Sequence, residues 1–262
     1  GIGGIHIRGF NSPGVAPVTG GKSGTEREVS KNDMKAACNS AAAVSLNNGE
    51  MQLCTIPLYY KLDGNDCRIL EPENMLCSRL EAEVHIITAK ESAVKNLTHS
   101  ITKAGYTIKA KAPSVLATCM AVFSEEEKKG GILLVDIGAD VTSFAVSVDN
   151  VPYCTAAVGM GSRYITSDIS KVLGIPLNIA EEIKKNDGIC HEIYLQEGKE
   201  IVLPISCGVL ADKAIKCSEV CEIIQARLWE IFMEIGSILE TENQLENING
   251  GIIFTGGGSL VP

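Results

Sequence analysis

The chain has 262 residues, of which 45% are hydrophobic and 21% charged, with a formal net charge of -9 at pH 7. This composition is that of a folded globular protein with room for two domains. The basic residues lie scattered among acidic ones, so we expect no nucleic-acid surface. No apolar run reaches the roughly 20 residues that span a bilayer, and no N-terminal signal sequence is visible.

The first 88 residues predict a small α+β module. An alternating strand enters a Gly/Pro loop within residues 1–20, Ser30 and Asp33 form a capping box at a helix start, and strands follow at 52–62 and 83–88. Residues 18–25 imitate a P-loop, but Ala16 stands where a glycine is required, so a surface hairpin is expected. The lone histidines of these strands, His6 and His85, are interpreted as structural.

The next residues predict a helix at 90–103, a strand at 106–110 and a helix at 114–123. An apolar strand at 132–135 then leads through Asp136 and Gly138 into a second strand at 144–148. Glycine lets backbone N–H groups approach an anion, and the carboxylate can hold Mg²⁺ through water. Asp136 and Gly138 therefore indicate a phosphate and metal turn, although a plain hairpin would give the same pattern.

The part that follows is mainly helical. After a strand at 151–158 and the Gly161 turn, helices are predicted at 164–173 and at 179–186, the second capped by Asn178. Glu181 and Lys184 share one face of that second helix, as an ion pair or as ligand contacts. Two short strands are expected within 192–205, and a long helix from about 209 to 239 carries Arg227.

A second glycine turn ends the sequence. The apolar strand Ile252–Phe254 runs into Gly256, Gly257, Gly258 and Ser259. A flexible linker is the alternative, but linkers seldom follow a strand of buried type, so a binding turn is favoured.

The ten cysteines are interpreted as reduced and mostly buried thiols. One group, Cys190, Cys207, Cys217 and Cys221 beside His191, invites a zinc hypothesis. It contains no C-x-x-C pair, so zinc is the weaker interpretation.

The two glycine turns together resemble the phosphate-2 and adenosine motifs of the actin-like ATPase superfamily. Within it, the segments at 1–14, 79–88, 161–169, 180–188 and 223–232 are similar to FtsA segments and occur in FtsA order. The resemblance implies an α/β actin-like (ribonuclease H-like) fold, partial, with an inserted small α+β subdomain. The implied division is an SHS2-type module at 1–88, a first-subdomain remnant at 89–130, a nucleotide subdomain at 131–165 and 246–262, and a helical subdomain at 166–245.

The resemblance also implies a site for ATP and Mg²⁺, with Asp136 holding the metal through water. Its residues would be Asp136, Gly138, Ala139, Thr142, Gly161, Glu181, Lys184, Gly256, Gly257, Gly258 and Ser259. Two departures from the superfamily pattern weaken turnover and affinity. Ser114 replaces a longer residue that positions the attacking water, and Asp140 adds a negative charge at the phosphate turn. We therefore expect slow ATP hydrolysis at most, and no catalytic residue is assigned.

The family's partners follow in the same way. Arg227, assisted by Lys216, would bind the acidic C-terminal peptide of FtsZ, residues 1–88 would contact other division proteins, and the protein would form filaments. The expected location is the cytoplasm, peripheral on the inner membrane face at the division site. Membrane attachment is expected through a C-terminal helix that lies outside this sequence. The phosphate-1 loop of the nucleotide site is also expected to lie outside it. The alternatives are a PilM-like pilus-assembly scaffold and an actin-fold sugar or acid kinase.

Overall fold

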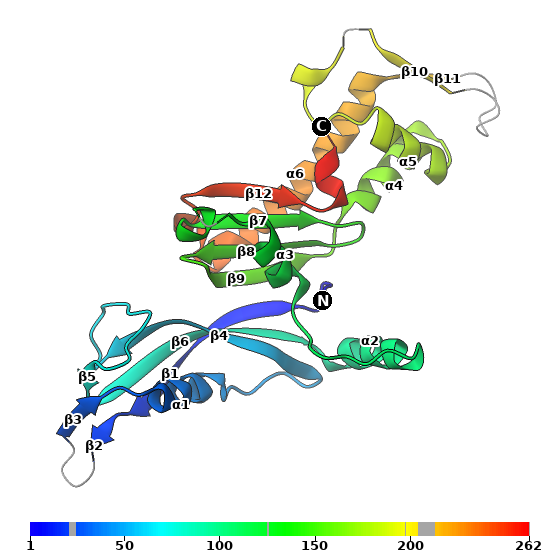
Figure 1. Ribbon diagram of the computed structural model, residues 1–262. Coiled ribbons are helices and arrows are strands. Elements are labelled where there is room, and N and C mark those ends of the chain that lie inside the picture. The colour runs from blue at the N-terminus through cyan, green and yellow to red at the C-terminus, as the bar shows by residue number, and fades with distance from the viewer. Residues whose placement is uncertain (21–24, 125, 197, 204–212, 262) are drawn as a thin grey trace. The chain divides into compact units, whose positions relative to one another are not determined.

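The computed structural model describes residues 1–261 except 21–24, 125, 197 and 204–212. The chain divides into two compact units. Both contain helices and strands, which Figure 1 labels and colours by residue number. Unit 1 consists of Gly1–Leu133, Ala145–Ala157 and Glu246–Gly251. Unit 2 consists of Leu134–Phe144, Val158–Leu245 and Ile252–Pro262.

The main sheet of unit 1 has three antiparallel strands in the order β1-β6-β4, namely β1 (Arg8–Pro17), β6 (Arg79–Lys90) and β4 (Glu50–Leu62). Helix α1 (Lys31–Ala42) packs on it, and the core between them includes Ala37, Leu80 and Ile86. A Cβ at Gly14 would lie 2.1 Å from the backbone nitrogen of Ala41. Only glycine therefore allows the helix to approach strand β1 so closely.

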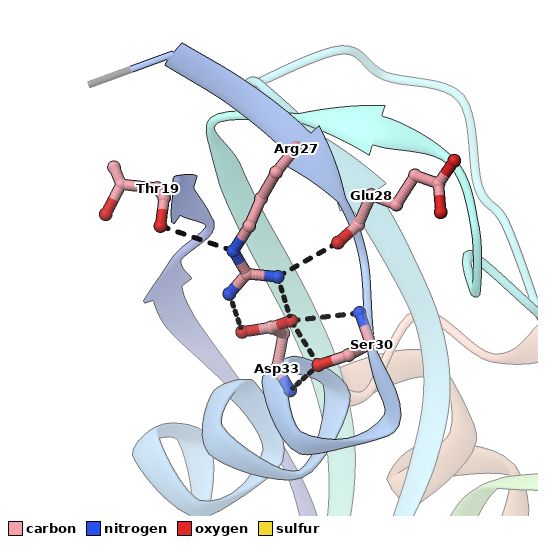
Figure 2. A network of polar contacts seen from close by, with 5 residues as sticks. All are labelled: Thr19, Arg27, Glu28, Ser30 and Asp33. Atoms are coloured by element: carbon pink, nitrogen blue, oxygen red, sulfur yellow. Dashed lines mark hydrogen bonds and ion pairs between the residues drawn. The ribbon is translucent and has the colours of Figure 1, made fainter. Parts of the chain in front are cut away.

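A second, smaller sheet in unit 1 has the order β2-β3-β5, with β2 (Thr19–Gly20), β3 (Thr25–Glu28) and β5 (Leu76–Cys77). Arg27 connects it to helix α1 through two hydrogen bonds to the Asp33 carboxylate, of 2.8 and 2.7 Å (Figure 2). Ser30 and Asp33 form the capping box that the sequence predicts, so that prediction is confirmed. The hairpin predicted at 18–25 has its turn at residues outside the described ones, although β2 and β3 pair antiparallel on either side.

A buried histidine joins strand β6 to strand β9 (Val151–Val158), whose residues up to Ala157 also belong to unit 1. His85 is 0% exposed, and its Nδ1 lies 2.6 Å from Oδ1 of Asn11 while its Nε2 lies 2.9 Å from Oγ1 of Thr155. The amide of Asn11 donates to the Tyr153 carbonyl, which leaves Oδ1 as the acceptor and assigns the ring proton to Nδ1. A Cβ at Gly9 would lie 2.2 Å from the Thr155 hydroxyl, so glycine is required beside this contact.

The remainder of unit 1 includes helices α2 (Glu91–Lys103) and α3 (Ser114–Val122) and the 3-10 helix at Glu127–Lys129. Both predicted helices are confirmed, but the strand predicted at 106–110 is wrong. A strand needs a neighbour for its backbone hydrogen bonds, and this segment pairs with none of the described strands. Tyr106 is instead 70% exposed.

A four-stranded sheet has the order β12-β7-β8-β9. Its further strands are β7 (Ile132–Ile137), β8 (Thr142–Val148) and β12 (Gly251–Thr255). The predicted strands at 132–135, 144–148, 151–158 and 252–254 all lie within them. The uniformly apolar run Ile132–Val135 is buried, as its sequence predicts.

Unit 2 contains three helices that surround one apolar core, α4 (Ser162–Leu173), α5 (Leu177–Asn186) and α6 (Cys217–Thr241). Its other elements are the hairpin of β10 (Glu200–Leu203) and β11 (Lys213–Lys216) and 3-10 helices at Glu192–Tyr194 and Gly257–Leu260. A further 3-10 helix, Leu245–Asn247, begins at the last residue of this part of unit 2 and continues in unit 1. Gly174 ends α4 in the left-handed conformation with φ 63°, as a helix-stopping glycine should.

Three predicted boundaries in unit 2 are wrong. The long helix begins at Cys217 rather than near 209, because residues 213–216 pair with β10 as strand β11; residues 209–212 lie outside the described ones. Pro176, not Asn178, occupies the cap position of α5, because the helix already begins at Leu177 and Asn178 lies inside its first turn. Residues 192–194 form a 3-10 turn instead of a strand.

Candidate nucleotide-binding site

Strand β7 delivers Asp136 into a tight turn in unit 2. The turn is closed by a hydrogen bond from the Gly138 nitrogen to the Val141 carbonyl, 3.0 Å. The start of α4 docks on it, since Ser162 N donates to the Gly138 carbonyl at 2.9 Å. A Cβ at Gly161 would lie 2.6 Å from the carbonyl oxygens of both Gly138 and Ala139. Gly161 is therefore a glycine because the helix start lies directly on the phosphate turn.

The C-terminal glycine turn lies against the same strand end. A Cβ at Gly256, whose φ is +85°, would be 2.5 Å from Asp136 Oδ1, and one at Gly258 would be 2.3 Å from the Ile137 side chain. Among the described residues, no atom outside Gly257 and its two chain neighbours lies within 4 Å of the corresponding position at Gly257, so that face of the turn is open there. The structure thus brings together the two glycine turns, which lie more than a hundred residues apart in sequence.

Asp136 is half-buried beside these glycines, and burial raises the pKa of its carboxyl group. Among the described residues no hydrogen bond or ion pair to this carboxylate is recorded. A half-buried carboxylate with free oxygens is a suitable acceptor for a hydrated Mg²⁺, which prefers oxygen ligands and keeps several waters. The residues present therefore fit the predicted metal, while no group of three or more ligating side chains exists in the described part of the chain.

Thr142 and Asp140, two predicted features of the phosphate turn, each have a polar partner. Thr142 is fully buried, and its hydroxyl donates to the Met160 carbonyl at 2.8 Å, so it holds the turn together. Asp140 points to Arg163, 2.7 Å away, with 60% of its side chain exposed. Its charge is therefore paired at the surface, which reduces the repulsion that the sequence predicts for a phosphate.

A chain of polar contacts extends from this turn to helix α5. Lys184 is buried, with 7% of its side chain exposed, and its ammonium group donates to the Ser162 carbonyl, to the Thr166 hydroxyl and to Glu181 Oε2, at 3.3, 2.9 and 2.7 Å. Since Ser162 is itself bonded to Gly138, Lys184 fixes the position of α5 relative to the phosphate turn.

Glu181 is the partly open member of this network. Burial by itself raises its pKa, but hydrogen bonds from Lys184, Thr166 and Lys185 outweigh burial and lower the pKa to about 2. Its side chain is 34% exposed, and Lys185, 67% exposed, reaches Oε1 at 3.1 Å. The carboxylate is ionised at neutral pH and has acceptor capacity left for a ligand hydroxyl.

The predicted partner residues lie elsewhere on unit 2. The Arg227 Nε donates to Asp168 at 2.7 Å and its Nη1 to Glu230 at 2.6 Å, while the guanidinium lies 5.5 Å from the centre of the Tyr164 ring. Arg227 is thus already paired, and a partner carboxylate would have to displace one acid. Lys216 is exposed at the end of β11, directly before helix α6. It lies eleven residues before Arg227, which corresponds to ~16 Å along the helix axis.

Sequence reasoning missed the residues that organise these sites. The Ser162 carbonyl and the Thr166 hydroxyl both hold Lys184, and Asp168 and Arg163 pair with Arg227 and Asp140. Ser162 and Thr166 share a helix face through i,i+4 spacing, which is the one available signal. This spacing does not show that α4 packs with that face against helix α5.

Solved structures define the class of fold. The fold is similar to that of a PilM–PilN type IV pilus biogenesis complex, with 17% identity and a TM-score of 0.59 over 97% of this chain and 61% of the other. It is also similar to MreB5 of Spiroplasma citri bound to ADP, with 20% identity and a TM-score of 0.53 over 66% of this chain and 54% of the other. The predicted partial actin-like fold is thereby confirmed.

Comparisons of the sequence identify the protein family within this class of fold. The model of the SHS2 domain inserted in FtsA matches residues 4–88, and that of cell division protein FtsA matches residues 133–259. Cell division protein FtsA of Borreliella burgdorferi is 32% identical over 259 residues, covering 99% of this chain and 62% of the relative. The chain therefore belongs to the FtsA family of cell-division proteins, and it spans about three fifths of the length of the curated relatives it matches.

None of the helices in the described part of the chain combines the length and the apolar character needed to cross a membrane.

Proposed function

We propose that this chain supplies the nucleotide-dependent part of an FtsA-type division protein, which binds ATP with Mg²⁺, assembles into filaments and holds the FtsZ ring at the inner face of the cytoplasmic membrane. The observation that carries the proposal is the meeting of Asp136, the Gly256 turn and the Lys184 network within unit 2. Membership of the FtsA family and the ADP bound by the structurally similar MreB5 give it further support.

The roles follow from the contacts. Glycine N–H groups of the two turns would bind the phosphates, and Asp136 would hold Mg²⁺ through water. Glu181 would accept the ribose hydroxyls with its exposed oxygen, positioned by buried Lys184, while exposed Lys185 would flank the base. Bound Mg²⁺ would supply charge neutralisation at the phosphates.

Hydrolysis would be slow at most. Ser114, at the start of α3, has a short neutral side chain that is too weak a base to activate water. The protein would then act as a switch that responds to bound nucleotide rather than as a turnover enzyme. The four-part division of the chain into subdomains also belongs to this proposal.

Nucleotide binding is tested by titrating the protein with a fluorescent ATP analogue in the presence of Mg²⁺. Glu181→Gln keeps the shape of the side chain but removes the charge, and we expect about tenfold weaker binding. Glu182→Gln is the matched control, because Glu182 is the exposed neighbour on the same helix. Equal affinity of the two variants would contradict the assigned site.

The partner claim needs a separate titration with a labelled FtsZ C-terminal peptide. Because Asp168 occupies Arg227, Asp168→Asn should release the guanidinium and tighten binding of an acidic peptide, whereas Arg227→Gln should weaken it about tenfold. Arg163→Gln, which removes an exposed arginine elsewhere on unit 2, is the control. If Arg227→Gln bound the peptide as tightly as the unmodified chain, Arg227 would be rejected as the docking residue. The separate proposal of nucleotide binding would not be affected.

A further inference from the structure

The outer face of helix α6 carries an apolar pocket of about 550 Å³. Its lining comprises Cys190, Glu222, Gln225, Ala226, Leu228, Trp229 and Phe232, which we call the Trp229 patch. Trp229 is 68% exposed, and the Phe232 ring lies 5.6 Å from the ring of Phe254, itself 47% exposed. Exposed aromatic side chains gathered around a pocket are typical of an interaction surface.

The charged residues of helix α6 and of the chain after it are mostly acidic. From residue 217 to residue 262 the sequence has one basic residue, Arg227, and seven glutamates, Glu219, Glu222, Glu230, Glu234, Glu240, Glu242 and Glu246. Arg227 is already paired with Asp168 and Glu230. Glu222 lies seven residues, or two helical turns, before Trp229 and shares its face of α6. Arg227 lies about 200° around the helix from Trp229 and contacts Tyr164 of α4, so it belongs to a different face of α6. On the Trp229 face an acidic partner would therefore be repelled, and a basic partner with apolar side chains would fit.

The same chain contains such a surface. Residues 84–124 have a single acid, Glu91, and five lysines, Lys90, Lys95, Lys103, Lys109 and Lys111. The expectation that basic residues lie scattered among acidic ones is therefore wrong for this segment. We call residues 90–111 the lysine segment. All five lysines are exposed, and Tyr106 between them is 70% exposed. Of the five, Lys95 is paired with Glu91 at 2.7 Å.

We propose that the lysine segment of one copy of this chain docks on the Trp229 patch of a second copy. Charge complementarity between the two surfaces selects this occupant, and Tyr106 supplies an apolar side chain for the pocket. The two surfaces are different, so the contact is heterologous. Each added copy leaves a free patch at one end and a free lysine segment at the other, which produces an open chain of subunits. This inference rests on the self-association in the proposed function and names its surfaces.

The lone tryptophan makes docking on this patch directly measurable, because Trp229 is the only Trp in the chain. As the protein concentration rises, we expect the Trp229 emission to shift to shorter wavelength together with an increase in mass by analytical ultracentrifugation. Association should weaken about tenfold as salt rises from about 50 to about 300 mM, since exposed charges are screened. Absence of association, or association that leaves Trp229 emission unchanged, would overturn the proposal.

Charge reversal provides the sharper test. Variant A combines Lys103→Glu with Lys109→Glu, and variant B combines Glu219→Lys with Glu222→Lys. Beside Tyr106, residues 103–111 of variant A then carry two glutamates and one lysine, and residues 219–222 of variant B carry two lysines. Each variant alone therefore brings like charges together at the contact and should remain monomeric, whereas an equimolar mixture brings opposite charges together and should associate in alternation. The control combines Lys31→Glu with Lys35→Glu on α1, changes the net charge as variant A does, and should associate like the unmodified chain.

Either variant associating alone like the unmodified chain, or a mixture that stays monomeric, would reject this contact. Thermal unfolding of each variant, followed by circular dichroism, checks that it is folded. Binding of the ATP analogue is measured in the same samples. Retained ATP binding with failed assembly rejects only the contact between copies, whereas assembly without ATP binding rejects only the nucleotide site.

Discussion

Two networks that pair a carboxylate with cations can be compared, one in each unit. In unit 1, both oxygens of Asp33 are bonded to Arg27, and Ser30 donates to the same carboxylate from its nitrogen and its hydroxyl (Figure 2). In unit 2, Glu181 is bonded to Lys184, Lys185 and Thr166. In both networks these hydrogen bonds hold the pKa of the carboxyl group below its ordinary value.

The networks differ in how much of the carboxylate they leave open. The Asp33 side chain is 11% exposed, and its bonds tie strand β3 to the start of α1. The Glu181 side chain is 34% exposed, while its main cation, Lys184, is buried. A closed network stabilises a fold, whereas a partly open one has acceptors left for a ligand. We therefore expect polar groups of unit 1 to control stability and those of unit 2 to control binding.

The largest expected effect concerns His85 in unit 1. Burial lowers the pKa of its imidazole to about 4, below an ordinary value of 6.5, so the folded state favours the neutral ring. Below the ordinary value the unfolded chain binds a proton that the folded chain excludes, and stability falls with pH between about 6.5 and about 4. Unfolding in urea should show a loss of about 2–3 kcal/mol between about pH 7 and about pH 4.5 from this group.

His85→Gln should reduce that pH dependence because glutamine does not titrate in this range. His99→Gln is the control, since His99 is an exposed histidine on α2. The unmodified chain and His99→Gln should lose stability equally on acidification, and His85→Gln should lose less. The same slope for all three proteins would show that His85 does not stay neutral in the fold.

A smaller effect is expected at the closed network. Asp33→Asn removes the charge that Arg27 and Ser30 contact, and we expect a loss of about 2 kcal/mol in the free energy of unfolding, the size of a hydrogen bond to a charged group. The control is Glu73→Gln, because Glu73 meets Lys31 only at 3.8 Å at the surface and should change stability by less than about 0.5 kcal/mol. Affinity for the ATP analogue should stay the same in both variants, and a loss in Asp33→Asn alone would break the distinction between the networks.

The sequence could predict the local part of this comparison. Ser30 and Asp33 are three residues apart, so the capping box is readable from spacing alone, and the glycine turns at Gly138 and Gly256 follow apolar strands. Glu181 and Lys184 also appear as an i,i+3 pair. These features depend on neighbours along the chain, which a single sequence contains.

The remainder depends on tertiary packing. Lys184 is buried only because α4 brings the Ser162 carbonyl to it, 22 residues away in sequence. Arg227 meets Asp168 across 59 residues, so the arginine that the resemblance assigns to a partner peptide is already paired within the chain. The segment 106–110 has the residues of a strand but no strand beside it among the described residues. Pattern reasoning finds candidate side chains, whereas their partners are set by contacts between distant elements.

The smallest expected effect is the change in ATP-analogue affinity on substituting Asp140. Whether binding becomes tighter or weaker tests the nucleotide site of unit 2. The Asp140–Arg163 pair is exposed, so its loss should change stability by less than about 0.5 kcal/mol. Asp140→Asn removes one negative charge near the phosphate turn and should tighten ATP-analogue binding by about twofold, whereas Arg163→Gln leaves the charge unpaired and should weaken binding by about twofold. Both changes should shrink in high salt because the charges are exposed. If Asp140→Asn tightened binding more than about tenfold, the carboxylate would have to face the phosphates rather than Arg163 when nucleotide binds. The phosphate turn would then hold nucleotide against a built-in repulsion, and the open network at Glu181 would have to supply most of the affinity.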